Sequence, residues 1–337
     1  MPGRSASVTI ADVARRAGVS RALVSIVLRG VPGASPENRE RVLRVAAELG
    51  YHPDQRARLL GSGRSRTVGV VFGLQEPFHG ELVEALYGAA SGSGWRLSLQ
   101  PRLARRPEPA AVRELLAERV ETVLLLGSGL DRRELTELGE RVPVVLLARS
   151  LAGGPAVPGV GTVRTDDQAG AELAVRHLLG LGHRHVAHVH GRKAPGAVER
   201  RRGYRDVLRA AGLEPDLVGG GTTGSSGEAA ARELLGRDAA ARPTAVLAFN
   251  DESAAGLLQS VRAAHLAVPG DLSVVGFDDS AVASLDTVAL TTVCQNAGVL
   301  AARAFEQATR RAEQEAGAQD VVIAPELVVR RTTAPPR

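Results

Sequence analysis

Residues 9–28 read TIADVARRAGVSRALVSIVL, and their spacing predicts two short helices joined by a tight turn at Gly18. The first helix would begin at Thr9 and the second at Ser20, because either hydroxyl can cap the free N–H groups of a helix start. The apolar residues that recur at helical spacing are Ala11, Val13, Ala14, Leu23, Val24, Val27 and Leu28. This is the layout of a helix-turn-helix, although an ordinary helical hairpin fits these residues equally well.

The distribution of charge decides between these two interpretations. Residues 1–66 contain 12 arginines, no lysine and five acidic residues, a net charge of +7, whereas the whole chain carries only +5. Residues 67–337 are therefore net negative. A basic surface confined to one small module is what neutralisation of DNA phosphates requires, whereas an excess spread over the chain would indicate only solubility. The N-terminal module is therefore predicted to bind nucleic acid.

Length and composition limit the class of protein. A chain of 337 residues exceeds the usual size of one core and predicts two or three domains. The N-terminus does not resemble a secretory signal, and no run of about 18 apolar residues could span a membrane. The single cysteine, Cys294, excludes an internal disulfide and fits a reducing compartment. We therefore expect a cytoplasmic protein that has no membrane partner.

A third helix and a linker are predicted after the first two helices. Ser35 followed by Pro36 is typical of a helix start, and Gly50 fits its end. The expected apolar stripe is Val42, Leu43, Ala46 and Leu49. Residues 53–66 then include a Gly-Ser-Arg run that reads as a linker, and residues 54–60 are too short to form a stable helix alone.

This N-terminal module resembles that of the LacI/GalR family of bacterial transcription regulators, named after the lactose and galactose repressors. The matching residues are TIADVA at 9–14, GVS at 18–20, VS at 24–25, AAELGYHP at 46–53 and ARLL at 57–60. The resemblance implies a headpiece over residues 1–52 and a hinge helix and linker over residues 53–66. It also implies that the hinge folds on operator DNA and inserts Leu60 into the minor groove. Departures at Leu23, Ile26, Arg29 and Asp54 leave the fold intact but prevent the operator sequence from being carried over.

The resemblance and the side-chain chemistry together predict the residues that contact DNA. Arg21 can pair with a guanine edge, and Ala22 is small enough to admit a thymine methyl group. Ser25 and Arg29 are better placed for phosphates. One short recognition helix makes few base contacts, so we expect a homodimer on a pseudo-palindromic operator in double-stranded DNA. The complete predicted set is Thr9, Ser20, Arg21, Ala22, Ser25, Arg29, Tyr51, Arg58 and Leu60.

Beyond residue 66 the sequence alternates between strand and helix patterns. Apolar runs at 68–72, 97–99, 122–126 and 144–147 predict one set of strands, and runs at 185–189, 245–249 and 272–277 predict a second. Strands that are apolar throughout are typical of parallel sheets covered by helices on both faces. The predicted fold class is therefore α/β behind an all-α headpiece, with two parallel-sheet lobes and a ligand cleft where the carboxyl ends of the strands meet.

The family resemblance extends over this core. The matching residues are VPVVL at 142–146, RRRGY at 200–204, FND at 249–251, VP at 268–269, LSVVGFDD at 272–279 and LTTVCQ at 290–295. The resemblance implies a periplasmic-binding-protein-like core over residues 67–330 that closes on a small effector and dimerises. The implied lobes are roughly residues 67–161 with 293–322, and residues 162–292 with 323–330.

The same resemblance implies an effector site formed by Phe78, His79, Arg200, Asn250, Asp278 and Gln295. Carboxylate and amide groups exchange hydrogen bonds with hydroxyls, and arginine provides a planar fork, so we expect a small polar effector such as a sugar or a related metabolite. Ala148 stands where some relatives have an acid, and Thr222 where some have an aromatic platform. A phosphorylated sugar or another polar metabolite therefore stays open. Asp278 could alternatively cap a neighbouring helix or loop.

Two other patterns suggest different chemistry. Residues 219–224, GGGTTG, satisfy the G-x-G-x-x-G pattern, but no convincing strand precedes them, so we interpret them as a flexible cleft loop. In the group His183, His185, His188 and His190, residues 185, 188 and 190 mix strand faces, and no cysteine or acidic cluster joins them, which favours structural histidines over a metal site. We expect no catalytic residues, cofactor or metal. The alternatives to a regulator are a nicotinamide enzyme and a transporter's ligand-binding protein, the latter opposed by the basic headpiece.

Overall fold

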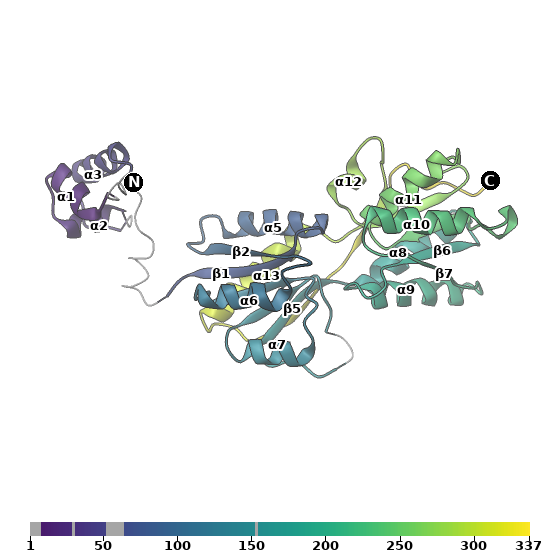
Figure 1. Ribbon diagram of the computed structural model, residues 1–337, viewed down its shortest axis with the longest axis horizontal. Coiled ribbons are helices and arrows are strands. Elements are labelled where there is room, and N and C mark those ends of the chain that lie inside the picture. Colours follow the sequence, from purple (N-terminus) through teal and green to yellow (C-terminus); the bar gives the residue numbers. More distant parts are fainter. Residues whose placement is uncertain (1–7, 29–30, 52–63, 152–153) are drawn as a thin grey trace. The chain divides into compact units, whose positions relative to one another are not determined.

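The computed structural model describes residues 8–28, 31–51, 64–151 and 154–337. The chain divides into two compact units, Met1–Ser65 and Arg66–Arg337. Their boundary lies one residue before the expected start of the core. Figure 1 shows the helices of the first unit and the strands and helices of the second. Within the described ranges, no helix is long and apolar enough to cross a membrane.

The described part of the first unit contains α1 (Ile10–Ala17), α2 (Arg21–Leu28) and α3 (Pro36–Glu48). These helices share one small core formed by Val13, Ala14, Ala17, Val24, Val27, Val42, Val45 and Ala46. Leu43, expected in the stripe of α3, is instead 49% exposed. Adjacent helix positions point about 100° apart, so a stripe that includes Val42 continues through Val45 and Ala46 rather than through Leu43.

The turn between α1 and α2 is formed by the residues that the sequence singled out. Gly18 ends α1 with a φ of 67°, a left-handed conformation that favours glycine. At the start of α2, the Ser20 hydroxyl accepts a hydrogen bond from the Leu23 N–H at 3.1 Å. At the start of α1, the N–H and hydroxyl of Thr9 donate to the Asp12 carboxylate at 2.9 and 2.6 Å, so this carboxylate also serves the helix start.

The first lobe of the second unit is a six-stranded parallel sheet with the order β11-β5-β4-β3-β1-β2. Its strands are β1 (Thr67–Gly73), β2 (Arg96–Arg102), β3 (Thr122–Leu126), β4 (Val144–Leu147), β5 (Val160–Thr165) and β11 (Asp320–Ile323). The helices α5 (Pro77–Ala90) and α13 (Ala297–Ala312) cover one face, and α6 (Glu108–Ala117) and α7 (Arg132–Gly139) cover the other (Figure 1). Burial on both faces explains why the central strands β3 and β4 are almost wholly apolar.

The second lobe repeats this arrangement with the order β12-β10-β9-β8-β6-β7, in which only β12 is antiparallel to its neighbour. Its strands are β6 (Val186–His190), β7 (Asp216–Gly219), β8 (Ala245–Ala248), β9 (Ser273–Asp278), β10 (Thr291–Cys294) and β12 (Glu326–Val328). The helices α8 (Asp167–Gly180) and α9 (Ala197–Ala210) cover one face, and α10 (Gly224–Leu235) and α11 (Asp251–Ala263) cover the other. The short helices η1 (Ala239–Ala241) and α12 (Ala281–Ser284) lie in connections.

The chain passes between the lobes after β5, after β10 and after β11, which corrects the lobe boundaries expected from the sequence. A boundary after residue 161 would cut β5, which pairs with β4 along its length and belongs wholly to the first lobe. Residue 293 was assigned to the first lobe, but β10 pairs with β9 in the second. The boundary follows from strand pairing, which the sequence pattern alone does not reveal.

The glycine-rich segment 219–224 also requires a correction. A strand does precede it, because β7 ends at Gly219 and pairs with β6. The segment leads directly into α10, where the Thr223 hydroxyl accepts from the Ser226 N–H at 3.3 Å. It is therefore a strand–turn–helix connection. The four residues of β7 follow Glu214 and Pro215, which made this strand look like a loop.

Candidate functional site

The headpiece presents the start of α2 as an exposed surface. Ser20, Arg21 and Ala22 are exposed, whereas Val24 and Val27 are buried against the other helices. Of the other residues predicted to contact DNA, Thr9 is exposed, Ser25 is half-buried, and Tyr51 packs against the headpiece core. Arg29, Arg58 and Leu60 lie outside the described residues. The geometry therefore leaves the guanidinium of Arg21 and the small side chain of Ala22 available to a groove of DNA.

In the core, one cavity of about 70 Å³ lies between the two lobes. All six residues predicted to bind the effector line it: Phe78, His79, Arg200, Asn250, Asp278 and Gln295. Ala148 and Thr222, compared with the family at the sequence level, line it too. Sequence reasoning missed Glu76, Phe249, Glu252 and Ser280, which complete much of the lining. Residues from both lobes, and Gln295 from the connection between the lobes after β10, thus line the same cavity.

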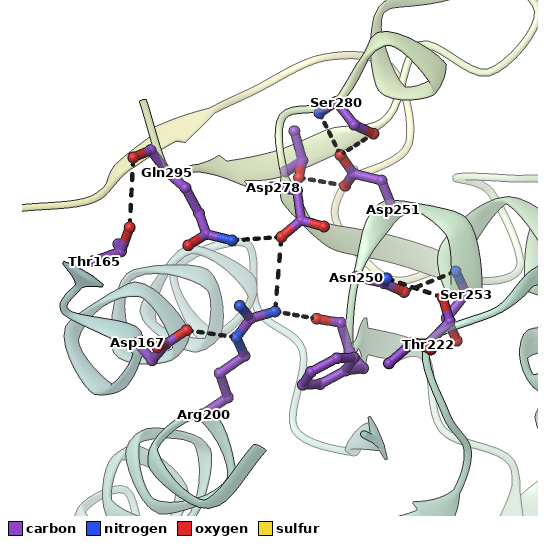
Figure 2. A network of polar contacts seen from close by, with 12 residues as sticks. Thr165, Asp167, Arg200, Thr222, Asn250, Asp251, Ser253, Asp278, Ser280 and Gln295 are labelled. Carbon is purple, nitrogen blue, oxygen red and sulfur yellow. Dashed lines mark hydrogen bonds and ion pairs between the residues drawn. The ribbon is translucent and has the colours of Figure 1, made fainter. Parts of the chain in front are cut away.

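Arg200, on α9, is held by contacts on every side (Figure 2). Its Nε donates to Asp167 Oδ1 at 2.8 Å, and its Nη1 donates to the Phe249 carbonyl at 2.7 Å. The guanidinium carbon also lies 3.5 Å from the centre of the Phe277 ring, a cation–π geometry. A buried arginine needs such partners, because an unpaired charge would be costly away from water. The fork is therefore fixed before any ligand arrives.

Asp278 lies at the end of β9 with a φ of 119°, a strained conformation for a side-chain-bearing residue. Its Oδ1 accepts from Gln295 Nε2 at 2.6 Å and lies 3.9 Å from Arg200 Nη1. Burial raises the pKa of Asp278 well above its ordinary value, against the opposing effect of Arg200. The carboxyl group thus faces the cavity, bonded to Gln295, instead of capping the helices or loops considered as its alternative role.

Asp251, the first residue of α11, is buried beside this site and accepts hydrogen bonds from residues around it. Its two oxygens accept from the Thr292 hydroxyl at 2.6 Å and from the N–H and hydroxyl of Ser280 at 2.8 and 2.9 Å. Burial raises the pKa of Asp251 to about 7. Asn250 precedes it and caps α11 by accepting from the Ser253 N–H at 3.0 Å. Asn250 therefore contributes to the shape of the helix start as well as to the cavity wall.

The first lobe contributes a second polar group around Glu76. Arg102 Nη2 donates to Glu76 Oε1 at 2.6 Å, and His79 Nε2 lies 3.1 Å from Oε2. His79 Nδ1 accepts from the Gly73 N–H at 2.9 Å, so the neutral ring carries its proton on Nε2 and donates it to Glu76. Burial lowers the pKa of His79 to about 4. Phe78, by contrast, belongs to the buried apolar core of this lobe and also lines the cavity.

One hydrogen bond links the lobes directly across the cleft. Glu81, on α5, accepts from the N–H of Ala281 at the start of α12 at 2.8 Å. Burial raises the pKa of Glu81, and the Ala281 hydrogen bond opposes this. Because the two partners belong to different lobes, opening the cleft would break this bond. The small volume of the cavity and this hydrogen bond indicate that the two lobes lie close together.

The histidine cluster is accounted for by local bonds. His183 contacts Thr244, His185 contacts Asp216, His188 contacts the Leu247 carbonyl and His190 contacts the Arg192 N–H. In the part of the chain that the structure describes, no three His, Cys, Asp or Glu side chains are grouped as a metal site requires. Each of these four histidines has a structural partner.

Comparison with known proteins identifies the two units. Residues 9–54 match the family described as "Bacterial regulatory proteins, lacI family", and residues 175–333 match a "Periplasmic binding protein-like domain". The HTH-type transcriptional regulator DegA of Bacillus subtilis is 31% identical over 97% of this chain and 98% of its own length.

Solved structures agree with these matches. A Lac repressor dimer bound to operator and the anti-inducer ONPF is 28% identical, with a TM-score of 0.83 over 98% of this chain and 100% of that one. A complex of the transcriptional regulator CelR with cellobiose is 32% identical, with a TM-score of 0.70 over 96% of this chain and 99% of that one. These relatives are regulators of transcription, and the matches cover both the headpiece and the core.

Proposed function

Because this chain belongs to the lacI family of bacterial regulatory proteins and is a DNA-binding regulator of transcription rather than an enzyme, we propose that it is a repressor that binds a pseudo-palindromic operator as a homodimer. A small polar effector, a sugar or sugar derivative, would bind between the lobes and control operator affinity. The observation that carries this proposal is the convergence of Arg200, Asp278 and Gln295 with first-lobe residues on one cavity. A regulator of this kind acts beside the chromosome, so we propose a cytoplasmic, nucleoid-associated location.

The DNA-binding part of the proposal rests on the exposed start of α2. Selection of duplexes from a random pool by the full chain should yield two symmetric half-sites. Arg21→Ala should cost about 1–3 kcal/mol of binding free energy and relax one base pair per half-site, because the arginine pairs with a guanine edge. The matched control is Arg202→Ala, an exposed arginine of α9. Uniform weakening on all sequences would instead assign Arg21 to a phosphate.

The hinge proposal concerns Leu60, outside the described residues. An apolar side chain inserted into the minor groove unstacks a base step, and the bent duplex offsets this cost with further contacts. Leu60→Ala should therefore weaken operator binding while leaving dimerisation and effector binding unchanged. Equal operator affinity of the variant and the parent chain would contradict this role.

The homodimer proposal is supported by apolar side chains that the isolated core leaves in solvent. Leu74 precedes α5, Tyr87 lies on it and Leu285 follows α12, and all three are more than half exposed. The Glu81–Ala281 bond brings α5 and α12 together, so these side chains lie on neighbouring elements. A dimer would remove them from water. Sedimentation should show a dimer at micromolar concentration, and a stable monomer with full operator affinity would contradict it.

A polar effector is supported by the cleft's donors and acceptors and by the relative that was solved with cellobiose. A thermal-shift screen of sugars on the full chain should identify a stabilising ligand. Arg200→Lys keeps the charge opposite Asp167 but loses the planar fork, so stabilisation by that ligand should fall. A hit that stabilises parent and variant equally would place its binding site elsewhere.

A further inference from the structure

The cavity between the lobes is lined by more acidic than basic groups. Glu76, Glu252 and Asp278 contribute carboxyl groups, whereas Arg200 is the one arginine or lysine among the described residues that line the cavity. The charge of Arg200 is already compensated by Asp167, which lies 2.8 Å from its Nε, while Asp278, whose pKa is raised by burial, lies 3.9 Å from its Nη1. An anionic ligand would therefore meet a compensated cation and several carboxyl groups. Phosphate recognition ordinarily requires the reverse, a cluster of cations or free backbone N–H groups.

Glu76 is the carboxylate of the first lobe that is best prepared to contact a ligand. Its side chain remains 39% exposed and lines the cavity, unlike Glu108, which is buried on the other side of Arg102. Arg102 is shared between these two acids, at 2.6 Å from Glu76 and 3.4 Å from Glu108. Glu108 also interacts with the charge of Arg149, so Arg102 serves mainly Glu76, and this ion pair adds no net positive charge at the edge of the cavity.

The position of Glu76 is fixed by its neighbours. Arg102 holds one oxygen and the Nε2 proton of His79 holds the other. A carboxylate offers about four lone-pair sites, so each oxygen can accept a further bond from a ligand. The backbone admits this arrangement only because two positions lack a side chain. A Cβ on Gly73 would collide with the Glu76 carboxylate, and one on Gly127 would lie 2.8 Å from His79 Nε2.

We propose that the effector carries no negative charge, and that Glu76 determines this specificity by accepting a hydrogen bond from a hydroxyl or ammonium group of an uncharged or amino sugar. The inference rests on the proposed function and narrows it, since a phosphorylated sugar fits the sequence equally well. Arg102 and His79 are positioning residues for Glu76. The opposing second lobe holds the same ligand through Arg200 and Asp278.

The test is isothermal titration of the full chain with matched probes: glucose, galactose, ribose and cellobiose, glucosamine and galactosamine, and glucose 6-phosphate, galactose 1-phosphate, ribose 5-phosphate and glucuronate. At least one uncharged or amino sugar should bind, and the phosphate or carboxylate counterpart of a binding monosaccharide should bind at least about tenfold more weakly. A counterpart that binds as tightly would overturn the inference while leaving an effector site in place. Failure of every probe would overturn the sugar effector itself.

Three variants assign the effect to Glu76. Glu76→Gln should weaken binding of the preferred sugar and narrow its advantage over the anionic counterpart, because the variant keeps an oxygen for Arg102 but loses the charge and the oxygen that accepts the Nε2 proton of His79. Glu76→Asp keeps the negative charge, but its shorter side chain moves the carboxylate oxygens away from the ligand. This variant should therefore bind the sugar more weakly and still bind the anionic counterpart more weakly than the sugar. Glu137→Gln, which removes an exposed carboxylate from α7, should change neither the affinity for the sugar nor the preference for the sugar over its anionic counterpart. Unchanged selectivity in a folded Glu76→Gln protein would contradict the role of Glu76.

Discussion

The two lobes present polar groups to the same cavity in different ways. In the second lobe, Arg200, Asp251 and Asp278 are almost fully withdrawn from solvent, and each has at least one hydrogen-bond partner within the protein before any ligand binds. In the first lobe, Glu76 remains 39% exposed and is held by Arg102 and His79 from one side. The comparison indicates that the two lobes have different roles in ligand binding. The second lobe holds its polar groups in fixed positions, and the first lobe supplies a contact that determines which ligand is preferred.

The physical basis of this difference is desolvation. A buried charge is tolerated only with partners, and removal of one partner leaves the other uncompensated. Rigidity of the second lobe is thus a consequence of burying Arg200 with Asp167. The exposed carboxylate of Glu76 loses little hydration in the folded protein and remains able to exchange water for a ligand hydroxyl.

The largest expected effect is on stability. Arg200→Ala should lower the free energy of unfolding by about 3–5 kcal/mol, because it leaves the buried carboxylate of Asp167 without its cation. Arg102→Ala should cost less, because Glu76 can be hydrated and the buried Glu108 keeps the Gly129 N–H, at 2.8 Å, and the charge of Arg149 nearby. Urea denaturation of the full chain measures both, with Arg202→Ala as the exposed control. Equal losses for Arg200→Ala and Arg102→Ala would remove the distinction between the lobes.

A second expectation concerns pH and the second lobe. Burial raises the pKa of Asp251 from 3.8 to about 7, so folding favours its protonated form. Its contribution to stability is therefore complete below about pH 4 and is lost as the pH rises towards 7. Asp251→Asn keeps an oxygen for the N–H and hydroxyl of Ser280 and turns an amide N–H towards the Thr292 hydroxyl, which can accept it, but removes this titration. Urea midpoints between pH 4.5 and 7.5 should depend less on pH in the variant, while the exposed Asp206→Asn should follow the parent chain.

In the first lobe, the stability contributed by His79 should change with pH in the opposite direction. Burial lowers the pKa of His79 from 6.5 to about 4, so folding favours the neutral ring. Its contribution is complete above about pH 6.5 and is lost as the pH falls towards 4. His79→Gln should reduce the loss of stability on acidification over this window, measured as the same urea midpoints. The exposed His265→Gln serves as control, and an acid loss identical in His79→Gln and the parent chain would contradict the assignment.

The smallest effect concerns the contact between the lobes. Glu81→Ala removes the acceptor of the Ala281 N–H and should weaken closure by about 1 kcal/mol or less, since the pair is partly exposed. Effector affinity should fall by about fivefold at most. Glu84→Ala, on the exposed side of α5, is the matched control. An unchanged affinity in Glu81→Ala would show that this bond does not contribute to closure.

The sequence predicted much of the fold because long apolar runs and helix caps are local signals. Strands β1, β2, β3, β4, β6, β8 and β9 and the helix pair around Gly18 were found in this way. Strands β5, β7, β10, β11 and β12 were not, because they are short or contain charged or glycine residues and gain stability from neighbours distant in sequence. The lobe boundaries were displaced for the same reason.

Prediction of the cavity residues from the sequence is limited in the same way. Its six expected residues came from family positions, and the structure brings all of them to one space. Glu76 was missed because its role depends on Arg102, 26 positions away on β2, and on a tautomer of His79 set by the Gly73 N–H. No local pattern carries this information. Exposure of Leu43 likewise depends on which of two adjacent apolar residues the neighbouring helices cover.

The most direct test of the whole account measures operator affinity of the full chain by fluorescence anisotropy, with and without the best-binding uncharged or amino sugar. In the parent chain the sugar should change operator affinity about 5–150-fold, in either direction, the usual range of coupling between two sites. Arg200→Lys should bind the operator normally without sugar and lose this response. A sugar that binds without changing operator affinity, or a response that persists undiminished in Arg200→Lys, would contradict control of DNA binding through the cleft.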